Sequence, residues 1–276
     1  MKYRKLDILY SELIVLFTSS LLTTILIGFI AVFQLPKIII VIVWLGLFAG
    51  LNYILIASPT KILLAGLLQL RTQPSLEVYI AKFLAKYIKQ SGTETVHIHV
   101  IEDRGYAVLY YADIRSLHLV FSSKLVEDWN EIDVESALLY LFDLLNHTFP
   151  LRDTCILVLA TIAERFIITS FVGASLVHMV RAHTDDERID RRAIGRIRYA
   201  MGYQAMLSKL KTGSTAPCRL PKSFGMNAVG DITGKGVDAS LYSVHETLDN
   251  RIEAIVGSSP DSQNPGIGNH TQLSVD

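Results

Sequence analysis

The sequence has few cysteines and no excess of charge of either sign, and both shortages exclude classes of protein. Two cysteines, Cys155 and Cys218, are too few for a disulfide framework, so we expect both thiols to be reduced. The 26 basic residues balance 26 acidic ones, so no strong field points to nucleic acid or to an acidic partner. The 276 residues leave room for one domain of ordinary size beyond a membrane anchor.

Charged side chains are missing from two long runs near the N-terminus, 13–33 and 38–57. Each run reaches the roughly 20 residues that a helix needs to cross about 30 Å of hydrocarbon. No small-residue cleavage site follows the first run, and the second comes straight after it, so the pair predicts an uncleaved anchor rather than a signal peptide. The connection is only 34–37, which predicts a tight transmembrane helical hairpin over residues 1–60. Asn52 lies within the second run, and we expect its amide to bond the neighbouring helix.

Basic residues are concentrated at the open ends of this hairpin. Its ends carry five and its turn carries one, namely Lys2, Arg4, Lys5, Lys61 and Arg71 against Lys37. The positive-inside rule therefore predicts that both chain ends lie in the cytoplasm. We expect an integral protein of a bacterial inner membrane, in contact with the lipid bilayer, whose following domain faces the cytoplasm.

Residues 61–256 predict an α+β domain that is mainly helical. After Pro74, an amphipathic helix is expected over 76–88. Three runs with the alternation of strands follow and predict a small antiparallel sheet: 96–100, 106–111 and 117–121. Residues 257–276 are rich in Ser, Pro, Gly and Asn, which predicts a disordered tail.

Two histidines, His97 and His99, project from one face of the first predicted strand. Such a pair can bind a metal, but no carboxylate or thiol is placed nearby to complete a site. We therefore expect these rings to lie on the solvated face of an edge strand.

Three helical regions follow the predicted sheet. Residues 132–146 are apolar on most sides, which predicts a helix buried in the core. Residues 155–180 are also apolar, but Glu164-Arg165 interrupts them, and a charged pair in mid-span is costly in lipid. Because this stretch is too short for a second transmembrane hairpin, we expect one buried or membrane-grazing helix. Residues 183–203 predict a solvated helix with i,i+4 ion pairs. Its narrow apolar stripe is Ala193, Ile194, Ile197 and Met201.

Four segments follow one another in the order of a known family. The first is the N-terminal hairpin with its cytoplasmic exit. The second is Leu-Val-Phe-Ser-Ser-Lys-Leu-Val at 119–126 with Asp-Val-Glu-Ser-Ala-Leu-Leu at 133–139, and the third is Asp-Glu-Arg-Ile-Asp-Arg at 186–191. The fourth is Leu-Tyr-Ser-Val-His-Glu-Thr-Leu-Asp-Asn-Arg-Ile-Glu-Ala-Ile at 241–255. Together they resemble the HtpX-type membrane zinc metallopeptidases, relatives of the CAAX prenyl proteases. The resemblance implies a zincin-like (gluzincin) metallopeptidase-type domain.

The residues that carry the chemistry of that family are replaced in this chain. In the family the second segment continues as H-E-x-x-H, in which two histidines bind zinc and the glutamate is the general base. Tyr140 and Leu144 stand at the histidine positions, and Leu141 stands at the glutamate position. The later ligand position falls on Asp186. Because leucine neither binds zinc nor accepts a proton, we expect no zinc cofactor and no standard hydrolysis here.

One alternative shifts the metal site by three residues along the same helix. Asp143 and His147 are also spaced i,i+4, and with Asp186 they would supply three zinc ligands. The resemblance further implies a cleft beside His245 and Arg251, which lie next to the metal in the family. The same two residues are equally compatible with an inherited structural hydrogen-bond pair.

Three hypotheses about function follow from these patterns. The first is an inactive HtpX-like pseudopeptidase that binds polypeptide or a partner membrane protein in membrane-protein quality control. The second is an active metalloendopeptidase that uses the displaced ligands, and the third is a structural protein of a membrane assembly. Bound zinc favours the second, and a cleft beside Tyr140 and His245 distinguishes the first from the third.

Overall fold

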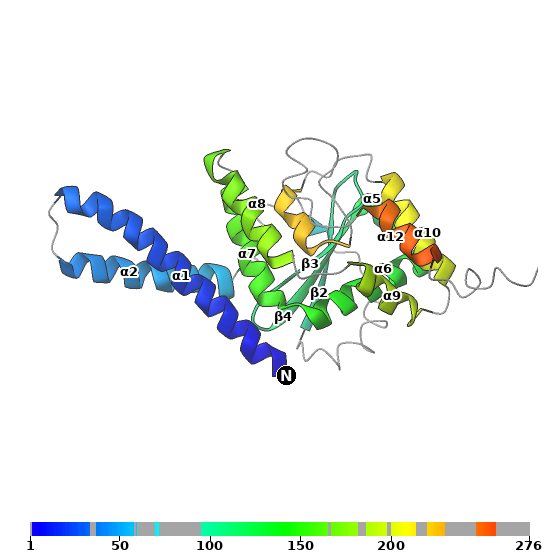
Figure 1. Cartoon of the computed structure of the whole chain (residues 1–276), viewed down its shortest axis with the longest axis horizontal. Helices are drawn as coiled ribbons and strands as arrows, with labels where there is room; N and C mark the ends of the chain where they lie inside the picture. The colour runs from blue at the N-terminus through cyan, green and yellow to red at the C-terminus, as the bar shows by residue number, and fades with distance from the viewer. Residues whose placement is uncertain are drawn as a thin grey trace, which may run out of the picture.

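The computed structural model describes residues 2–33, 37–57, 59, 70–71, 95–164, 167–181, 186–197, 200–213, 220–229 and 247–257. Within these ranges the chain forms a long helical hairpin and a mainly helical body with a small mixed sheet (Figure 1). Several predicted features lie outside the described residues: the helix at 76–88, the tail beyond 257, and His245.

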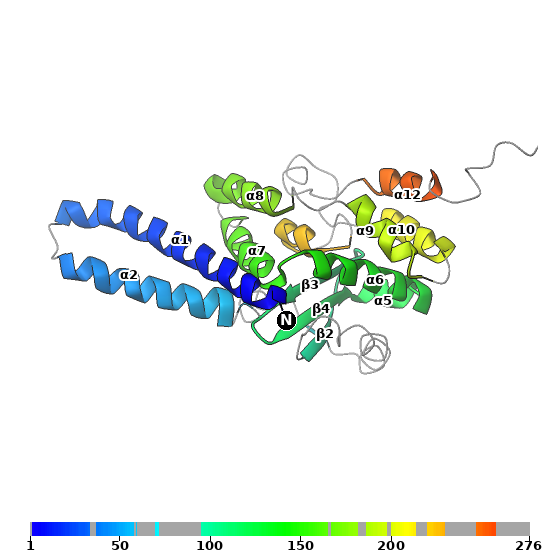
Figure 2. The ribbon, with the colours of Figure 1, turned by 60° about the horizontal axis from the view of Figure 1, so that its bottom comes forward.

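The hairpin consists of α1 (Lys2–Phe33) and α2 (Lys37–Asn52), and α2 continues into a short π-helix, η1 (Tyr53–Ala57). The two helices lie side by side and extend away from the body (Figure 2). Two stretches, Lys5–Ile25 and Ile38–Ala57, are helical and are long and apolar enough to cross a membrane. The described chain therefore contains the pair of apolar helices that the sequence predicts.

Small and polar side chains of α1 face the protein, whereas large apolar ones face outward. On the inner face every fourth residue is buried: Asp7, Ser11, Val15, Ser19 and Thr23. On the opposite face every fourth residue is exposed: Leu9, Leu13, Phe17, Leu21 and Ile25. A helix in water has the reverse arrangement, whereas helices in lipid pack through small and polar residues. The exposed face of α1 is thus its apolar face, which is the arrangement expected of a helix that contacts lipid.

The two hairpin helices also share a polar contact. With its amide nitrogen turned toward the carboxylate, Asn52 of α2 donates to Oε2 and Oε1 of Glu12 of α1, at 3.1 and 3.2 Å. A bond of this kind between apolar helices avoids an unsatisfied amide in hydrocarbon. The contact confirms the prediction that Asn52 bonds the neighbouring helix.

Among the described residues, the sheet has four strands in the order β1-β2-β4-β3. Their bounds are β1 (Leu70–Arg71), β2 (Thr95–Ile101), β3 (Val108–Ala112) and β4 (Ser116–Ser122). β3 and β4 form an antiparallel hairpin and β1 is antiparallel to β2, but β2 and β4 run parallel. The prediction of an antiparallel sheet is therefore wrong for the central pair of strands.

The turn between β3 and β4 explains this topology. Oδ1 of Asp113 accepts hydrogen bonds from the backbone N–H groups of Arg115 at 2.8 Å and Ser116 at 2.6 Å, which closes a tight hairpin. Before β3, the chain passes the end of β4, where the N–H of Ala107 donates to Oγ of Ser122 at 3.0 Å. β3 thereby pairs with the outer edge of β4 and leaves β2 to pair with the other edge.

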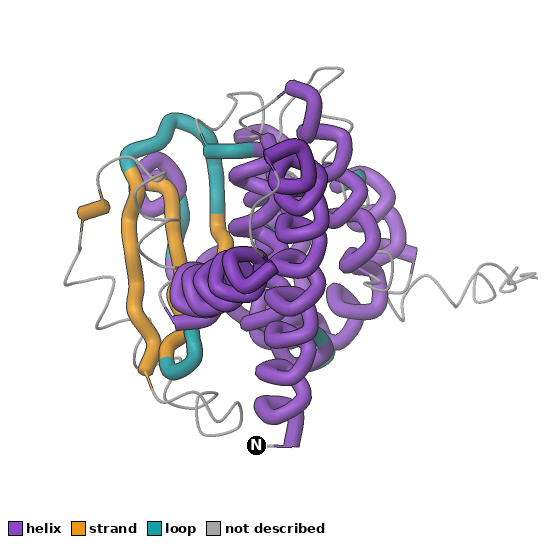
Figure 3. Tube along the Cα trace, turned by 90° about the vertical axis from the view of Figure 1, so that its left-hand side faces the viewer, coloured by secondary structure: helices purple, strands orange, loops and turns teal. Residues whose placement is uncertain are grey.

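Both faces of the sheet carry packed apolar side chains, and the strands lie along one side of the helical body (Figure 3). One face packs in a cluster with α6 (Glu131–His147) and includes Tyr110, Leu119 and Phe121. The other face packs in a cluster with α7 (Pro150–Glu164) and the base of the hairpin. That second cluster includes Leu109, Val120, Val15, Leu55 and Cys155. The core of the body thus continues into the hairpin.

α6 is buried on most of its sides, as its sequence predicts, and it follows the short helix α5 (Ser123–Asp128). The Asn130 side chain accepts from the N–H of Asp133, and the Asp133 carboxylate accepts from the N–H of Asn130, both at 3.0 Å. This capping box satisfies donors that the first turn of a helix leaves free. The position of α6 is therefore fixed by its own N-terminus as well as by the core.

The apolar stretch 155–180 is not one helix, contrary to the prediction. α7 ends at Glu164, and α8 (Ile167–Arg181) follows and packs along it. The Glu164 carboxylate accepts from the N–H groups of Lys222 at 2.8 Å and Ser223 at 3.1 Å, at the start of the 3₁₀ helix η2 (Lys222–Asn227). The charge thus meets a polar partner within the protein. Each helix has 15 residues, which at about 1.5 Å per residue is too short to cross a bilayer.

Three further helices belong to the described body: α9 (Asp186–Ile194), α10 (Ala200–Gly213) and α12 (Leu248–Gly257). The helix predicted at 183–203 is therefore two helices, because the chain turns between α9 and α10. Ala193 is buried as the predicted stripe requires, but Met201 is 83% exposed, since it belongs to the second helix. An i,i+4 ion pair joins Arg191 to Glu187, as the charge pattern predicts.

Candidate functional site

Tyr140 of α6 and Asp186 of α9 meet inside the body, at two positions that the resemblance assigns to metal ligands. The Tyr140 hydroxyl donates a hydrogen bond of 2.6 Å to Oδ1 of Asp186. Both residues are buried, with 0% and 3% of their surface exposed. α6 supplies Tyr140 from its buried middle, and α9 supplies Asp186 as its first residue.

Arg251 of α12 lies against the same tyrosine. Its guanidinium carbon is 4.7 Å from the centre of the Tyr140 ring, which is within range of a cation–π interaction. Its Nε and Nη2 donate to Oδ2 and Oδ1 of Asp190 at 2.8 and 2.7 Å, and its Nη1 donates to the carbonyl of Val229 at 2.8 Å. Because Arg251 is fully buried, these bonds compensate for a charge that has lost its water.

Tyr203 of α10 completes this group. Its hydroxyl donates to Oδ1 of Asp190 at 2.6 Å. Burial, followed by the nearby Asp190 carboxylate, raises the pKa of Tyr203 well above its ordinary value, so the hydroxyl keeps its proton. Burial is the largest single influence on the pKa of Arg251 and lowers it, but the Asp190 carboxylate, Tyr140 and Tyr203 together outweigh burial and hold that pKa above its ordinary value. We call the group the buried Tyr–Arg network: Tyr140, Asp186, Asp190, Tyr203 and Arg251.

The buried Tyr–Arg network offers hydrogen bonds and a fixed positive charge rather than a set of metal ligands. Leu141 and Leu144, at the positions of the base and the second histidine, are fully buried in the apolar core. The Arg251 guanidinium beside Tyr140 would repel a metal ion placed there. Among the residues that the structure describes, no three His, Cys, Asp or Glu side chains are arranged to hold a metal ion.

The displaced candidates Asp143 and His147 lie in different surroundings from Asp186. Asp143 is fully buried, and its Oδ1 lies 3.2 Å from Nη1 of Arg196, while its Oδ2 lies 3.7 Å from Nη1 of Arg192. Nδ1 of His147 is 2.7 Å from the backbone carbonyl oxygen of Asp143. Two arginine side chains thus lie where a metal ion beside this carboxylate would have to bind.

Of the five network residues, the sequence names three and misses Asp190 and Tyr203. Asp190 stands within the segment 186–191, one helical turn after Asp186, and this spacing is a signal that the two carboxylates share a helix face. No local pattern marks Tyr203, because its partner comes from another helix. His245 lies outside the described residues, so Arg251 alone represents the predicted pair.

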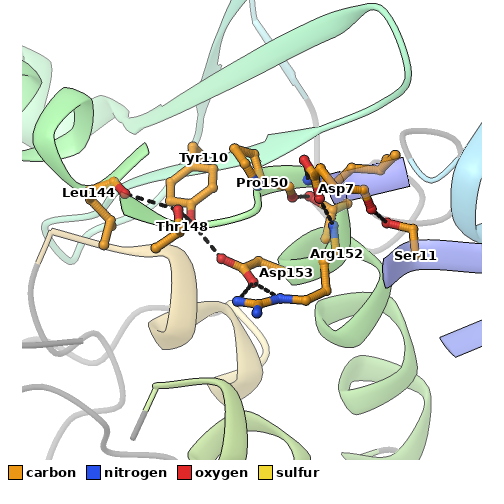
Figure 4. A network of polar contacts seen from close by, with 10 residues as sticks. Asp7, Ser11, Tyr110, Leu144, Thr148, Pro150, Arg152 and Asp153 are labelled. Atoms are coloured by element: carbon orange, nitrogen blue, oxygen red, sulfur yellow. Dashed lines mark hydrogen bonds and ion pairs between the residues drawn. The ribbon is translucent and has the colours of Figure 1, made fainter. Parts of the chain in front are cut away.

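A second polar network connects the hairpin to the body (Figure 4). Asp7 of α1 accepts hydrogen bonds from the backbone N–H groups of Leu151 at 3.0 Å and Arg152 at 2.9 Å. These donors belong to the first turn of α7, so Asp7 is a helix cap supplied from another helix. Arg152 donates to Oδ1 of Asp153 at 2.6 Å, and the Tyr110 hydroxyl lies 3.4 Å from Oδ2 of Asp153. The network thus joins the helical hairpin, α7 and the sheet.

The strand histidines form a third polar group. His97 is exposed, which agrees with the expectation of a solvated position. The expectation of an edge strand is wrong, because β2 lies between β1 and β4, and His99 contacts His118 of β4. Oδ2 of Asp113 lies 3.3 Å from Nε2 of His118, so a carboxylate does lie near these rings, contrary to the expectation. Burial lowers the pKa of His118 to about 4, although its contact with Asp113 opposes this shift.

At positions named by the resemblance, Tyr140 therefore contacts both Asp186 and Arg251. They bring together a phenol, a carboxylate and a guanidinium group in the packed core. The likeness to the metallopeptidases rests on the four sequence segments. Comparison of the chain with protein-family models, curated proteins and solved structures finds no match.

Proposed function

We propose that this chain is a membrane-anchored HtpX-like pseudopeptidase, which is catalytically inactive and binds a polypeptide or a partner membrane protein in membrane-protein quality control. The observation that carries the proposal is the hydrogen bond between Tyr140 and Asp186, with Arg251 against the Tyr140 ring. Residues distant in sequence meet at positions where the resemblance expects a zinc ion and its neighbours. Their side chains bond to one another, which supports a retained frame without the metal chemistry.

The proposal includes a bacterial inner-membrane hairpin with the body on the cytoplasmic side. The outward apolar face of α1 and the basic residues at the open ends of the hairpin support it. Reporter proteins that are active only in the cytoplasm, fused to either chain end, test the orientation. We expect both fusions to be active, and an inactive but stably expressed fusion at either end would contradict it.

The outer edge of β3 bears on the kind of partner. Extended peptides bind many sheets by adding a strand to an exposed edge. In this protein the N–H of Val229 donates to the carbonyl of Val108 at 2.9 Å, and the N–H of Ala112 donates to Oγ1 of Thr154 at 2.8 Å. Because the body itself bonds this edge, we favour a partner that meets the hairpin in the membrane over a peptide that extends the sheet.

A structural protein of a membrane assembly is one alternative. The complete burial of Tyr140 and Arg251 favours it, because their polar atoms are enclosed by protein and not presented to a ligand. An active metalloendopeptidase is the other alternative. The two arginines beside Asp143 argue against it, since they already neutralise one of its proposed ligands.

Cleavage and binding assays on the full chain, purified in detergent, distinguish these candidates. For a pseudopeptidase we expect no cleavage of a labelled unfolded polypeptide, with or without a chelator, but saturable binding of a labelled membrane-protein segment. Chelator-sensitive cleavage that is lost in His147→Ala and kept in the exposed-site control His178→Ala would overturn the proposal. If the chain shows no cleavage and no binding, the structural protein is the remaining candidate.

A further inference from the structure

The outer face of α8 exposes large apolar side chains, whereas its inner face buries smaller ones. Phe171 is 70% exposed, Val172 is 54% exposed and Met179 is 64% exposed. On the inner face, Ala174 and Val177 are buried. A helix at the surface of a water-soluble domain turns its polar side outward, and a contiguous exposed apolar surface is typical of an interaction site. The outer face of α8 therefore calls for an apolar partner.

The composition and length of α8 indicate what that partner is. The sequence has no Asp, Glu, Lys or Arg from 166 to 180, and it has an arginine on each side of this run, Arg165 and Arg181. The 15 residues of α8 extend over about 22 Å at about 1.5 Å per residue, which is less than the roughly 30 Å of a hydrocarbon core. An apolar helix of this length with basic ends suits the boundary between acyl chains and anionic headgroups.

The outer face of α8 lies close to the helical hairpin. α1 and α8 both pack on α7, and in Figures 1 and 2 alike α7 and α8 lie on the side of the body from which the hairpin extends. Ala174 and Val177 belong to the same apolar cluster as Val15 and Leu55 of the hairpin. α1 and α8 also share one arrangement, with smaller side chains inward and large apolar ones outward. The apolar surface of the hairpin thus has a neighbour of the same kind on the body.

We propose that the outer face of α8, formed by Phe171, Val172 and Met179, lies in the lipid of the leaflet nearest the body. The inference rests on the membrane anchor of the proposed function and adds a second point of contact to it. Lipid fits this face better than a second copy of the chain, because the face adjoins the apolar hairpin and has arginines at both ends. Two points of contact also fix the tilt of the body relative to the membrane.

Fluorescence quenching by nitroxide-labelled lipids tests this placement in the full chain, reconstituted into phospholipid vesicles. A polarity-sensitive dye is attached to Phe171→Cys or Met179→Cys in a Cys218→Ser background, in which the remaining Cys155 is buried. We expect both dyes to shift their emission to the blue and to be quenched by nitroxides on the acyl chains. A nitroxide near the headgroup should quench more than one near the chain end, because α8 is too short to reach far into the bilayer.

Two exposed side chains supply matched controls. Phe17, 71% exposed, is the counterpart of Phe171 and lies in the middle of the apolar stretch Lys5–Ile25 of α1. The dye on Phe17→Cys should be quenched most by the nitroxide near the chain end. Met201 of α10, 83% exposed, is the counterpart of Met179, and the dye on Met201→Cys should be neither shifted nor quenched. Circular dichroism and gel filtration verify that each labelled variant folds like the wild type.

The pattern of quenching separates this inference from the proposed function. Quenching of the dye on Phe17→Cys, but not of those on Phe171→Cys and Met179→Cys, would overturn the contact of α8 with lipid and leave the anchor intact. No quenching on Phe17→Cys would contradict the anchor itself. Equal quenching on Met201→Cys would reduce the contact to unspecific adsorption of the body. An unquenched dye on Met179→Cys, with a disulfide between two chains of the unlabelled variant, would assign this face to a second copy and overturn the inference.

Discussion

Arg251 and Asp190 form a two-point ion pair inside the body, with Nε–Oδ2 and Nη2–Oδ1 distances of 2.8 and 2.7 Å. Their side chains are 0% and 1% exposed, so neither charge has access to water. Asp190 comes from α9 and Arg251 from α12, which makes the pair a link between two helices that are distant in sequence.

Removing one partner of this pair should strongly destabilise the body. We expect Asp190→Asn or Arg251→Met to lower the free energy of unfolding by about 3–5 kcal/mol, because the remaining charge stays buried without its partner. Denaturation in mild detergent, followed by the fluorescence of the buried Trp129, measures the effect. The exposed pair of Arg191 and Glu187 is the control, and Arg191→Met should change stability by no more than about 0.5 kcal/mol. Equal effects of the internal and surface variants would contradict the importance of burial.

Tyr140→Phe should destabilise the body without creating or removing any peptidase activity. The variant removes the donor of the 2.6 Å bond to Asp186 and leaves that buried carboxylate with one hydrogen bond fewer, at a cost of about 1–3 kcal/mol. The matched control is Tyr106→Phe, since the bond of Tyr106 to Asp128 lies at the surface. A Tyr140→Phe variant as stable as the wild type would show that the bond contributes little.

Asp7→Ala should loosen the start of α7. It removes the acceptor for the N–H groups of Leu151 and Arg152, and the loss of a helix cap costs about 0.5–2 kcal/mol. Hydrogen exchange of the segment that begins at Pro150 should become faster. Asp7→Asn retains one side-chain oxygen as an acceptor and should have a smaller effect. Unchanged exchange in Asp7→Ala would mean that the cap is not formed in solution.

Acidification should weaken the body through His118. The pKa of this ring falls from 6.5 to about 4 on folding, mainly because the ring is buried. Between these two pH values the unfolded chain binds more protons than the folded chain. The contribution of the neutral His118 ring to the free energy of unfolding is therefore fully present above pH 6.5. It is lost as the pH falls toward 4, by about 3 kcal/mol in total. Asp113, His97 and His99 face this ring. His118→Gln should show a shallower decline of melting temperature with acid than the wild type, and His178→Gln should follow the wild type.

The Cys155 thiol should be unreactive in the folded protein. Burial raises its pKa to about 12, and its Sγ donates to the carbonyl of Leu55 in η1 at 3.3 Å. In a Cys218→Ser background, a maleimide at neutral pH should label Cys155 only after denaturation, because the thiolate is the reactive form. Mass spectrometry of the protein before and after unfolding measures the difference. Rapid labelling of the folded chain would show that the base of the hairpin separates from α7.

Features that depend on local pattern could be predicted from the sequence. The apolar runs at 13–33 and 38–57 correspond to hairpin helices, and three strands lie within one or two residues of their predicted positions. The order of the strands could not be predicted, because alternation shows which side of a strand is buried but not which strand is its neighbour. The end of α7 at Glu164 could not be predicted for the same reason, because the residues that bond the Glu164 carboxylate, Lys222 and Ser223, are far along the chain.

The candidate site shows the same division. Tyr140 and Asp186 could be named because the resemblance supplies their positions, and the structure brings them together. The roles of Asp190 and His118 depend on side chains from other elements, Arg251 in one case and His99 in the other. Spacing along one helix or one strand contains no information about such partners, so only the folded arrangement reveals them.

The burial of Val15 and Leu55 in the cluster that also contains residues of α7 and of the second face of the sheet has a practical consequence for attempts to make a water-soluble fragment. Deleting residues 1–60 would take away part of this cluster, remove the Leu55 carbonyl that accepts from the Cys155 thiol, and remove the acceptor that Asp7 gives to α7. We expect such a fragment to aggregate. Cleavage beyond η1 would likewise fail to release a working body, because the helical hairpin is a structural part of it and not a detachable tether.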